Sequence, residues 1–299
     1  MCGIVGLFRK HEDEAVPLGE LFAPMLVCLT DRGPDSAGLA VYGDDAPDGA
    51  IKVTLRQTGD GVDWSALADD LGRTFKSDAS IAINASYAVI KLTADESRLR
   101  SHLAAHHPSV RVMSVGRRIE ILKEVGDPAS IVDRFGVRGM RGSHMIGHTR
   151  MATESAVTTD GSHPFSTGMD LCLVHNGSLS NHNRLRRRLA RYGIEFRTEN
   201  DSEVAAGYLM WRLREGDTLE AALESALRDL DGFYTFAVGT ADGFAVLRDP
   251  IACKPAVMAE TDDYVAIASE YRALAGLPGI GDANVWEPAP AIVYTWGRN

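Results

Sequence analysis

The chain has 299 residues, 45% of them hydrophobic, which is enough for one large domain or two small ones with a substantial buried core. Its 31 lysine and arginine residues are outnumbered by 41 aspartate and glutamate residues, and the net charge of −10 argues against nucleic acid or an anionic membrane as the main partner. The four cysteines are scattered, and we find neither an apolar run of ~18 residues nor a signal-like start, so we expect a cytoplasmic protein without a metal site.

The first residues place a cysteine directly after the initiator methionine. Cys2 is small enough for Met1 to be removed, which would leave a thiol and a free α-amine on one residue. The α-amine titrates near pH ~8 and a thiol near ~8.5, so the amine can serve as general base for its own side chain. Residues 3–8 form an apolar run broken by glycines, which predicts a buried strand with Cys2 at its tip.

A helical repeat of apolar residues at 18–29 precedes a polar loop and a predicted strand at 39–42. The loop contains Arg32 and Asp35, together with a proline and two glycines. From composition alone, this loop is a turn that carries a solvated ion pair.

Between about residues 44 and 142 the pattern changes to an alternation of short strands and helices, which indicates an α/β insertion. Within it, His102 and His106 have the i, i+4 spacing of a metal-binding pair. No nearby carboxylate or cysteine completes a ligand set, so we expect surface histidines. The predicted strands cover 51–57, 80–92, 111–115 and 118–123, and the predicted helices cover 95–106 and 128–135.

Polar residues end several predicted elements after the insertion. The apolar strand at 171–175 ends at Asn176 and Gly177. This dipeptide is most often a hairpin turn, but a side-chain amide beside an unhindered N–H also gives the two converging donors of an oxyanion hole. A helix is predicted from about 200 to 214, where Asp201 or Ser202 is available as a plain N-cap.

The last third of the chain predicts helices followed by antiparallel strands. A basic helix at 179–192 is either a solvated face or a docking patch for an acidic partner. A capping box at 217–220 opens a second helix, and four strands are predicted between 233 and 269. A strand meander with helices grouped outside it indicates an α+β fold.

Six short motifs occur in one order along the chain, and together they resemble the class II glutamine amidotransferases. The resemblance covers residues 1–43 and about 143–275, and leaves the insertion outside. The motifs are Met1-Cys2-Gly3-Ile4-Val5-Gly6, Arg32-Gly33-Pro34-Asp35-Ser36-Ala37-Gly38, Gly147-His148-Thr149-Arg150-Met151-Ala152-Thr153, His163-Pro164-Phe165, His175-Asn176-Gly177 and Asp201-Ser202-Glu203.

The resemblance implies a four-layer αββα sandwich of two antiparallel sheets, the N-terminal nucleophile hydrolase fold. We expect a single glutamine amidotransferase type-2 domain over residues 1–299, with an inserted α/β subregion at about 44–142. Cys2 would attack the side-chain amide of glutamine with its own α-amine shuttling the proton. Asn176 and the Gly177 N–H would stabilise the oxyanion.

The resemblance also implies how glutamine is held. Arg150 would pair with the α-carboxylate of the substrate and Asp201 with its α-ammonium. Thr153 and His163 resemble pocket-lining residues of the family. Two further residues, Arg32 and Asp35, look like supports of the nucleophile strand. In the loop that folds over glutamine, the family often has an aromatic residue after the arginine, whereas this chain has Met151.

The resemblance further implies a partner in trans, because relatives continue into a synthase, transferase or isomerase domain where this chain ends. The layout is similar to the stand-alone glutaminase subunit of glutamate-synthase-like systems such as N-methylglutamate synthase. We expect a hetero-oligomer that passes ammonia to a separate synthase subunit. FMN, and any iron–sulfur centre, would belong to the partner subunits, with no cofactor in this chain. The alternatives are another N-terminal nucleophile amidase and a non-catalytic, glutamine-sensing regulatory subunit.

Overall fold

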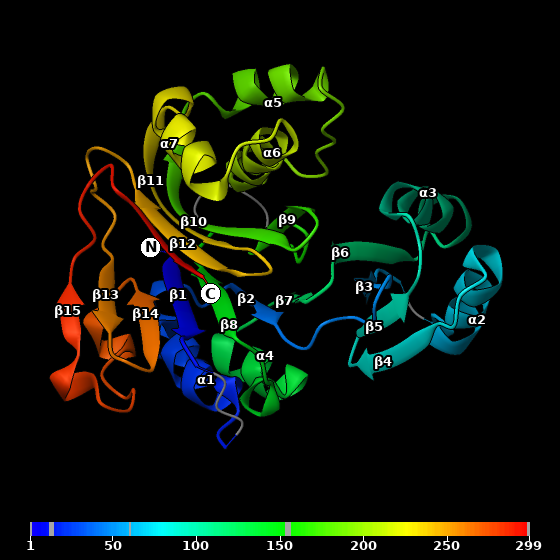
Figure 1. The fold of residues 1–299 in the computed structure, drawn as a ribbon, viewed down its shortest axis with the longest axis horizontal. Helices are drawn as coiled ribbons and strands as arrows, with labels where there is room; N and C mark the ends of the chain where they lie inside the picture. Colours follow the sequence, from blue (N-terminus) through cyan, green and yellow to red (C-terminus); the bar gives the residue numbers. More distant parts are fainter. Residues whose placement is uncertain (1, 12–14, 60, 153–156, 298–299) are drawn as a thin grey trace.

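Two antiparallel sheets form the main body of the computed structural model, which describes residues 2–11, 15–59, 61–152 and 157–297 (Figure 1). The larger sheet has seven strands, and β1 lies at its centre. In order across the sheet these strands are β15 (Asn284–Trp286), β13 (Val257–Glu260), β14 (Tyr264–Ala268), β1 (Gly3–Arg9), β8 (His144–Arg150), β2 (Ser36–Tyr42) and β7 (Ile119–Val125).

The second sheet has five strands, and its longest pairing joins β10 to β11 from Cys172 opposite Gly239 to Leu179 opposite Gly232. In order across the sheet the strands are β16 (Val293–Gly297), β12 (Gly243–Arg248), β11 (Gly232–Gly239), β10 (Leu171–Leu179) and β9 (Phe165–Gly168).

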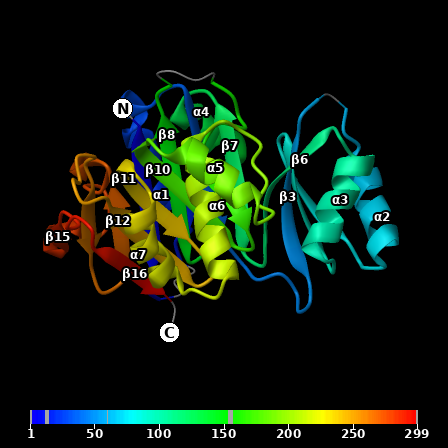
Figure 2. The ribbon, with the colours of Figure 1, turned by 90° about the horizontal axis from the view of Figure 1, so that it is seen from above.

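The two sheets stack face to face and carry helices on their outer faces (Figures 1 and 2). Between them lies an apolar layer to which Ile4 and Ile146 contribute from one sheet and Val174 and Val246 from the other. This arrangement confirms the predicted α+β class with its αββα layers. Helices α1 (Leu18–Cys28) and α4 (Pro128–Phe135) cover the seven-stranded sheet, and α5 (His182–Ala190), α6 (Asp201–Arg214) and α7 (Leu219–Asp229) lie beside the five-stranded sheet.

Strand β1 shows why its sequence reads as one apolar run. Successive side chains of a strand point to opposite faces, so both faces of a central strand must be apolar. Val5 and Leu7 pack in the cluster beneath α1, whereas Ile4 and Phe8 pack between the sheets. The predicted strand at the N-terminus is therefore confirmed, and Cys2 stands just before it.

The inserted residues form a separate four-stranded sheet beside the main body (Figure 2). Its first helix has no counterpart in the prediction, although Asp63 caps it and Leu67 and Leu71 are buried on one side. The insertion contains β4 (Ser80–Asn84), β5 (Tyr87–Leu92), β3 (Ile51–Gln57) and β6 (Val110–Gly116), with helices α2 (Trp64–Phe75) and α3 (Glu96–His106).

This separate sheet spans residues 51–116 and is shorter than the insertion expected at about 44–142. Strand β7 pairs with β2 along its whole length, and α4 packs on the main sheet. The reason is burial: Ile119 and Ile121 lie in the apolar layer between the two large sheets.

Asp170 joins the inserted sheet to the main body. Its N–H donates to the Val115 carbonyl at 3.0 Å, and its carboxylate accepts from three successive backbone N–H groups that begin at Arg117. The junction between β6 and β7 is thereby fixed to the turn before β10. No helix within the described ranges is long and apolar enough to cross a membrane.

Candidate active site

Cys2 is held through its backbone by residues from two different parts of the fold. Its carbonyl oxygen accepts hydrogen bonds from Arg32 Nε at 3.0 Å and from Asn176 Nδ2 at 3.1 Å. Its Sγ lies 3.9 Å from the Met151 carbonyl oxygen, and the residue is partly exposed. The structure therefore brings together the predicted nucleophile and the predicted oxyanion-hole amide.

Arg32 is fixed in turn by Glu270. Its Nη1 lies 2.8 Å from Glu270 Oε1, and this hydrogen bond is the main cause of the lowered pKa of Glu270. The composition-based expectation of a solvated Arg32–Asp35 ion pair is wrong, because Arg32 is buried and bonds Glu270. Neighbouring Ser269 bonds both the N–H and the carbonyl of Ile4 at 2.9 Å, which ties the same segment to β1.

Asp35 holds the backbone that lies next to the Cys2 side chain. Its Oδ2 accepts from the Ala152 N–H at 2.8 Å, and its own N–H donates to the Arg150 carbonyl at 3.1 Å. These bonds hold the chain just after β8, where Met151 contacts Cys2. Asp35 thus positions backbone rather than pairing with a solvent-exposed charge.

Asn176 and Gly177 lie inside β10 and do not form a hairpin turn. Gly177 stands opposite Tyr234 with φ +151°, and a Cβ built on it would lie 2.0 Å from the Phe233 carbonyl oxygen. Only glycine fits such a close approach between two strands at this backbone angle. Asn176 and Gly177 therefore lie beside Cys2 within a continuous pairing of β10 with β11, and the Gly177 backbone has a conformation that favours glycine.

Asp201 opens α6 without capping it. The N-cap is Asn200, whose Oδ1 accepts the Ser202 N–H at 2.9 Å, so the expected plain cap at Asp201 or Ser202 is wrong. Asp201 Oδ2 accepts the Leu179 N–H at 2.8 Å, and its side chain is 21% exposed. Its carboxylate thus lies at the end of β10 with charge accessible to a ligand.

Arg150 ends β8 as a buried residue, 6% exposed. A Cβ built on Gly161 would lie 3.5 Å from Arg150 Nη1, so the guanidinium group lies against the 158–163 turn. Arg150 at the end of β8 and Asp201 at the start of α6 thus provide opposite charges, with Asp201 bonded to the last residue of β10, the strand that carries Asn176. Thr153, the further predicted pocket residue, lies outside the described residues.

Three buried histidines and Ser202 form a polar cluster beneath these residues. Ser202 Oγ lies 2.8 Å from His163 Nε2 and 2.9 Å from His175 Nδ1, and His148 donates to the His175 carbonyl at 3.0 Å. Burial lowers the pKa of His148 to about 3 and lowers the pKa values of His163 and His175. The three histidines are therefore neutral at pH 7. His163 is buried in this cluster, with 5% of its surface exposed. The bridging role of Ser202 could not be predicted from the motifs.

Lys123 is a second residue near the candidate active site, after Ser202, that the sequence motifs did not indicate. Its Nζ donates to the carbonyls of Asp160, Ser162 and Pro164 at 3.2, 2.6 and 3.2 Å and lies 4.5 Å from the centre of the Phe165 ring. The turn that carries His163 is therefore attached to β7 by one buried amine. Burial lowers the pKa of Lys123 to about 7.

This lowered pKa predicts a stability that depends on pH. In the unfolded chain a lysine titrates near pH ~10.4, so between about pH 7 and about pH 10 unfolding takes up a proton. The free energy of unfolding should therefore rise with pH across that window, by at most about 1.4 kcal/mol per pH unit. Urea unfolding of the wild type and Lys123→Met from pH 6 to 10 measures the effect. Parallel pH profiles for the two proteins would contradict it.

The residues most able to hold a metal lie in the insertion. Asp70, His102 and His107 have ligand atoms within 4.8 Å of one another, and both Nε2 atoms hydrogen-bond Asp70 Oδ2, at 2.7 and 2.9 Å. These hydrogen bonds lower the pKa of Asp70 to about 2. The expectation that no carboxylate lies near these histidines was wrong, because Asp70 is on α2, a helix that the sequence pattern did not predict. The second histidine of the predicted pair, His106, does not belong to the group. These three side chains form a hydrogen-bonded cluster between α2 and the C-terminal end of α3.

The αββα layers, with Cys2 just before the central strand β1, define the class of fold, the N-terminal nucleophile hydrolase fold. Glutamine phosphoribosylpyrophosphate amidotransferase from B. subtilis has the same fold, with a TM-score of 0.63 at 19% identity, over 99% of this chain and 47% of that one. A family model described as a glutamine amidotransferase domain matches residues 148–276.

Two full-length relatives then show the family. The glutamine amidotransferase-like protein GlxB of Rhizobium meliloti (strain 1021) is 58% identical over 297 residues, covering 99% of this chain and 98% of the relative. A putative glutamine amidotransferase of Methanothermobacter thermautotrophicus is 32% identical over 304 residues, covering 98% and 99%. The chain belongs to the class II glutamine amidotransferases.

Proposed function

We propose that this protein is a glutaminase subunit in which Cys2 hydrolyses L-glutamine to glutamate. The observation that carries the proposal is the Cys2 carbonyl, which accepts from both Arg32 and Asn176. That contact puts the thiol-bearing residue next to an amide donor on a rigid strand. Rigid placement of nucleophile and oxyanion donors is what acyl transfer requires.

The proposed reaction begins once Met1 is removed. The Cys2 α-amine takes the Sγ proton, and the thiolate attacks the side-chain carbonyl carbon of glutamine. Asn176 Nδ2 and the Gly177 N–H stabilise the oxyanion, and the protonated amine gives its proton to the departing nitrogen, which leaves as ammonia. Water activated by the same amine then cleaves the thioester and yields glutamate.

The proposed specificity follows from opposite charges at two corners of the site. Arg150 pairs with the α-carboxylate as a fork, and Asp201 holds the α-ammonium. Among the described residues, Asp201 Oδ1 makes only long contacts, 3.4 Å to Ser202 Oγ and 3.8 Å to His175 Nδ1. One carboxylate oxygen is therefore available to the substrate while the other anchors to β10.

We further propose that the ammonia passes to a synthase subunit of the glutamate-synthase-like type, with FMN and any iron–sulfur centre on that partner. Ammonia released to water is mostly protonated at neutral pH and is no longer a nucleophile, so transfer to an acceptor gives the reaction its use. Co-purification from the native source followed by mass spectrometry tests the partner. Recovery of this chain alone, with glutaminase activity, would contradict transfer in trans.

Substrate kinetics of Asp201→Asn separate this function from that of another amidase. The variant keeps an oxygen for the Leu179 N–H but loses the negative charge, so we expect KM for glutamine to rise about 10- to 100-fold with a small change in kcat. N-acetylglutamine, which lacks an α-ammonium, should be a poor substrate of the wild type. Equal turnover of glutamine and acetylated or simple amides would favour a different N-terminal nucleophile amidase.

Intact-mass measurement of the native protein tests the regulatory alternative. Removal of Met1 frees the α-amine on which the proposed mechanism depends. Retained Met1 together with glutamine binding but no glutamate release would favour a glutamine-sensing subunit.

A further inference from the structure

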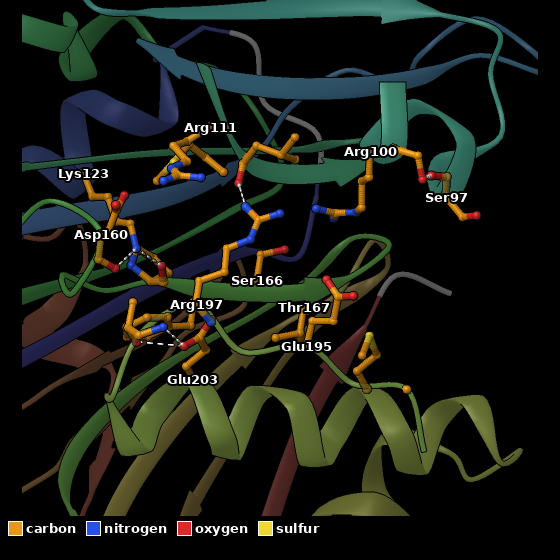
Figure 3. Close-up of a pocket in the computed structure, with 18 residues that line it drawn as sticks. Ser97, Arg100, Arg111, Lys123, Asp160, Ser166, Thr167, Glu195, Arg197 and Glu203 are labelled. Atoms are coloured by element: carbon orange, nitrogen blue, oxygen red, sulfur yellow. Dashed lines mark hydrogen bonds between the residues drawn. The ribbon is translucent and has the colours of Figure 1, made fainter. Parts of the chain in front are cut away.

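A cavity of about 600 Å³ lies where the inserted sheet meets the main body (Figure 3). One wall is made by α3 and β6 of the insertion, and the other by β9, the 193–198 segment and α6. Cys2, Arg32, Asn176 and Asp201 do not line this cavity, whereas Lys123, which bonds the turn that carries His163, does. It is therefore a second concave site, separate from the proposed glutamine site.

Three arginines from three elements stand on its walls: Arg100 on α3, Arg111 on β6 and Arg197 after α5 (Figure 3). Arg100 is neutralised by Glu96, with Nε 2.8 Å from Oε1. Within the described ranges, Arg111 and Arg197 have no carboxylate at ion-pair distance. Partial burial, followed by the charges of Arg100 and Arg111, lowers the pKa of Arg197.

The acidic residues of the cavity do not cancel this charge. Glu203 uses both carboxylate oxygens on the backbone of Arg197 and Thr198, at 2.9 and 2.8 Å, and Asp160 pairs with Arg56 at 2.7 Å. Glu195 remains as the one wall carboxylate without a bond among the described residues. Within the described ranges, two guanidinium groups without an ion-pair partner, those of Arg111 and Arg197, thus stand beside a single carboxylate that is free of hydrogen bonds.

The walls also offer hydroxyl donors. Ser166 Oγ is buried and has no hydrogen-bond partner among the described residues. Ser97 lines the opposite wall, where the Ser101 hydroxyl already donates to the Ser97 carbonyl at 2.9 Å. A buried hydroxyl without a partner costs free energy that a ligand could recover. Guanidinium forks and hydroxyls together are the donor set that recognises carboxylate and phosphate oxygens.

We propose that this cavity binds a small organic or inorganic anion through Arg111 and Arg197, with Ser166 as an additional donor. The ligand carries carboxylate or phosphate oxygens, and it holds the inserted sheet against the main body. Arg197 already crosses this boundary, because its Nη1 donates to the Val112 carbonyl at 3.3 Å.

The same elements lead from the cavity to the glutamine site. Glu203, which fixes the backbone of Arg197, lies in the first turn of α6 two residues after Asp201. On the other side, Lys123 lines the cavity and bonds the Ser162 carbonyl next to His163. An anion that orders Arg197 would therefore restrain the element that carries Asp201, and we expect it to lower KM for glutamine. This effect on KM rests on the proposed glutaminase function, whereas the binding itself does not.

The test is calorimetric titration of the full chain at low ionic strength, with inorganic phosphate in one arm and succinate in the other. We expect saturable binding of one anion per chain in at least one arm, and the arm that binds identifies the oxygen chemistry. Arg197→Gln and Arg111→Gln should each weaken it about 10-fold or more, the usual worth of a charge-assisted hydrogen bond. Arg184→Gln on α5 makes the same change of net charge away from the cavity and should bind as the wild type does.

Two results would overturn the site: no saturable binding in either arm, or equal weakening by Arg184→Gln and Arg197→Gln. Arg111→Lys, which keeps the charge and should bind with intermediate affinity, guards against a loss caused by misfolding. Binding with an unchanged KM for glutamine would overturn the coupling alone. Absence of glutaminase activity with intact anion binding would contradict the proposed function and leave the anion site standing.

Discussion

Replacing Cys2 with alanine is expected to abolish the release of glutamate from glutamine, by about 1,000-fold or more in kcat. Alanine at position 2 is as compatible with Met1 removal as cysteine, so the free α-amine is kept and only the thiol is lost. The Sγ atom contacts the protein through the Met151 carbonyl at 3.9 Å, and the change should leave the melting temperature nearly unchanged. Activity and thermal unfolding of the same preparation therefore separate chemistry from stability.

The matched control for this variant is Cys253→Ala. Cys253 is a free, exposed cysteine, so its replacement removes an accessible thiol at a position that we assign no role. We expect wild-type activity from it. Glutaminase activity that survives in Cys2→Ala would rule out Cys2 as the nucleophile, whatever the behaviour of the control.

The second large effect is expected for Gly177→Ala. A Cβ at this position would lie 2.0 Å from the Phe233 carbonyl oxygen, and the backbone has φ +151°. Strands β10 and β11 would have to separate, which we expect to lower the free energy of unfolding by about 3 kcal/mol. Since Asn176 is the adjacent residue, the same movement should lower kcat about 100-fold.

Gly216→Ala controls for backbone conformation without the clash. Gly216 has φ +101°, and a Cβ there would meet no atom within 4 Å. It should lose only about 1 kcal/mol of stability and keep full activity. Similar losses in the two variants, measured by urea unfolding and glutaminase kinetics, would show that the close approach at Gly177 has no special importance.

The sequence was most informative where residues close in the chain act together. Cys2 with its apolar strand, and Asn176 with Gly177, could be recognised because each pair forms one local unit. The motif order then gave the four layers. The partner of Arg32 could not be read in this way, because Glu270 lies 238 residues further along the chain and only the sheet brings them together.

The insertion was predicted less well for two physical reasons. Helix α2 was missed although Asp63 and the buried Leu67 and Leu71 follow a helical period, and with it the carboxylate of Asp70. The sequence analysis assigned strand β7 to the insertion, because the residues of a strand at such a boundary do not indicate which sheet the strand joins. Its pairing with β2 is a tertiary choice that local pattern does not encode.

The cavity of the three arginines was beyond sequence reasoning altogether. Arg100, Arg111 and Arg197 come from segments whose proximity depends on how the insertion docks. A single arginine on a helix or strand is usually a solvated side chain, so composition offered no reason to group them. The cluster became visible only with the packing of β6 beside β9.

The shared carbonyl of Cys2 has a consequence for how the protein can evolve. Asn176 belongs to the five-stranded sheet, whereas Cys2 precedes a strand of the seven-stranded sheet. Their hydrogen bond therefore joins the two sheets at the edge of the apolar layer. Any substitution of Ile146 or Val174 that lets one sheet slide on the other would move the nucleophile away from its amide donor. The interior of this molecule is therefore subject to selection for catalytic alignment as well as for stability, and its apolar residues should tolerate fewer exchanges than their chemistry alone would allow.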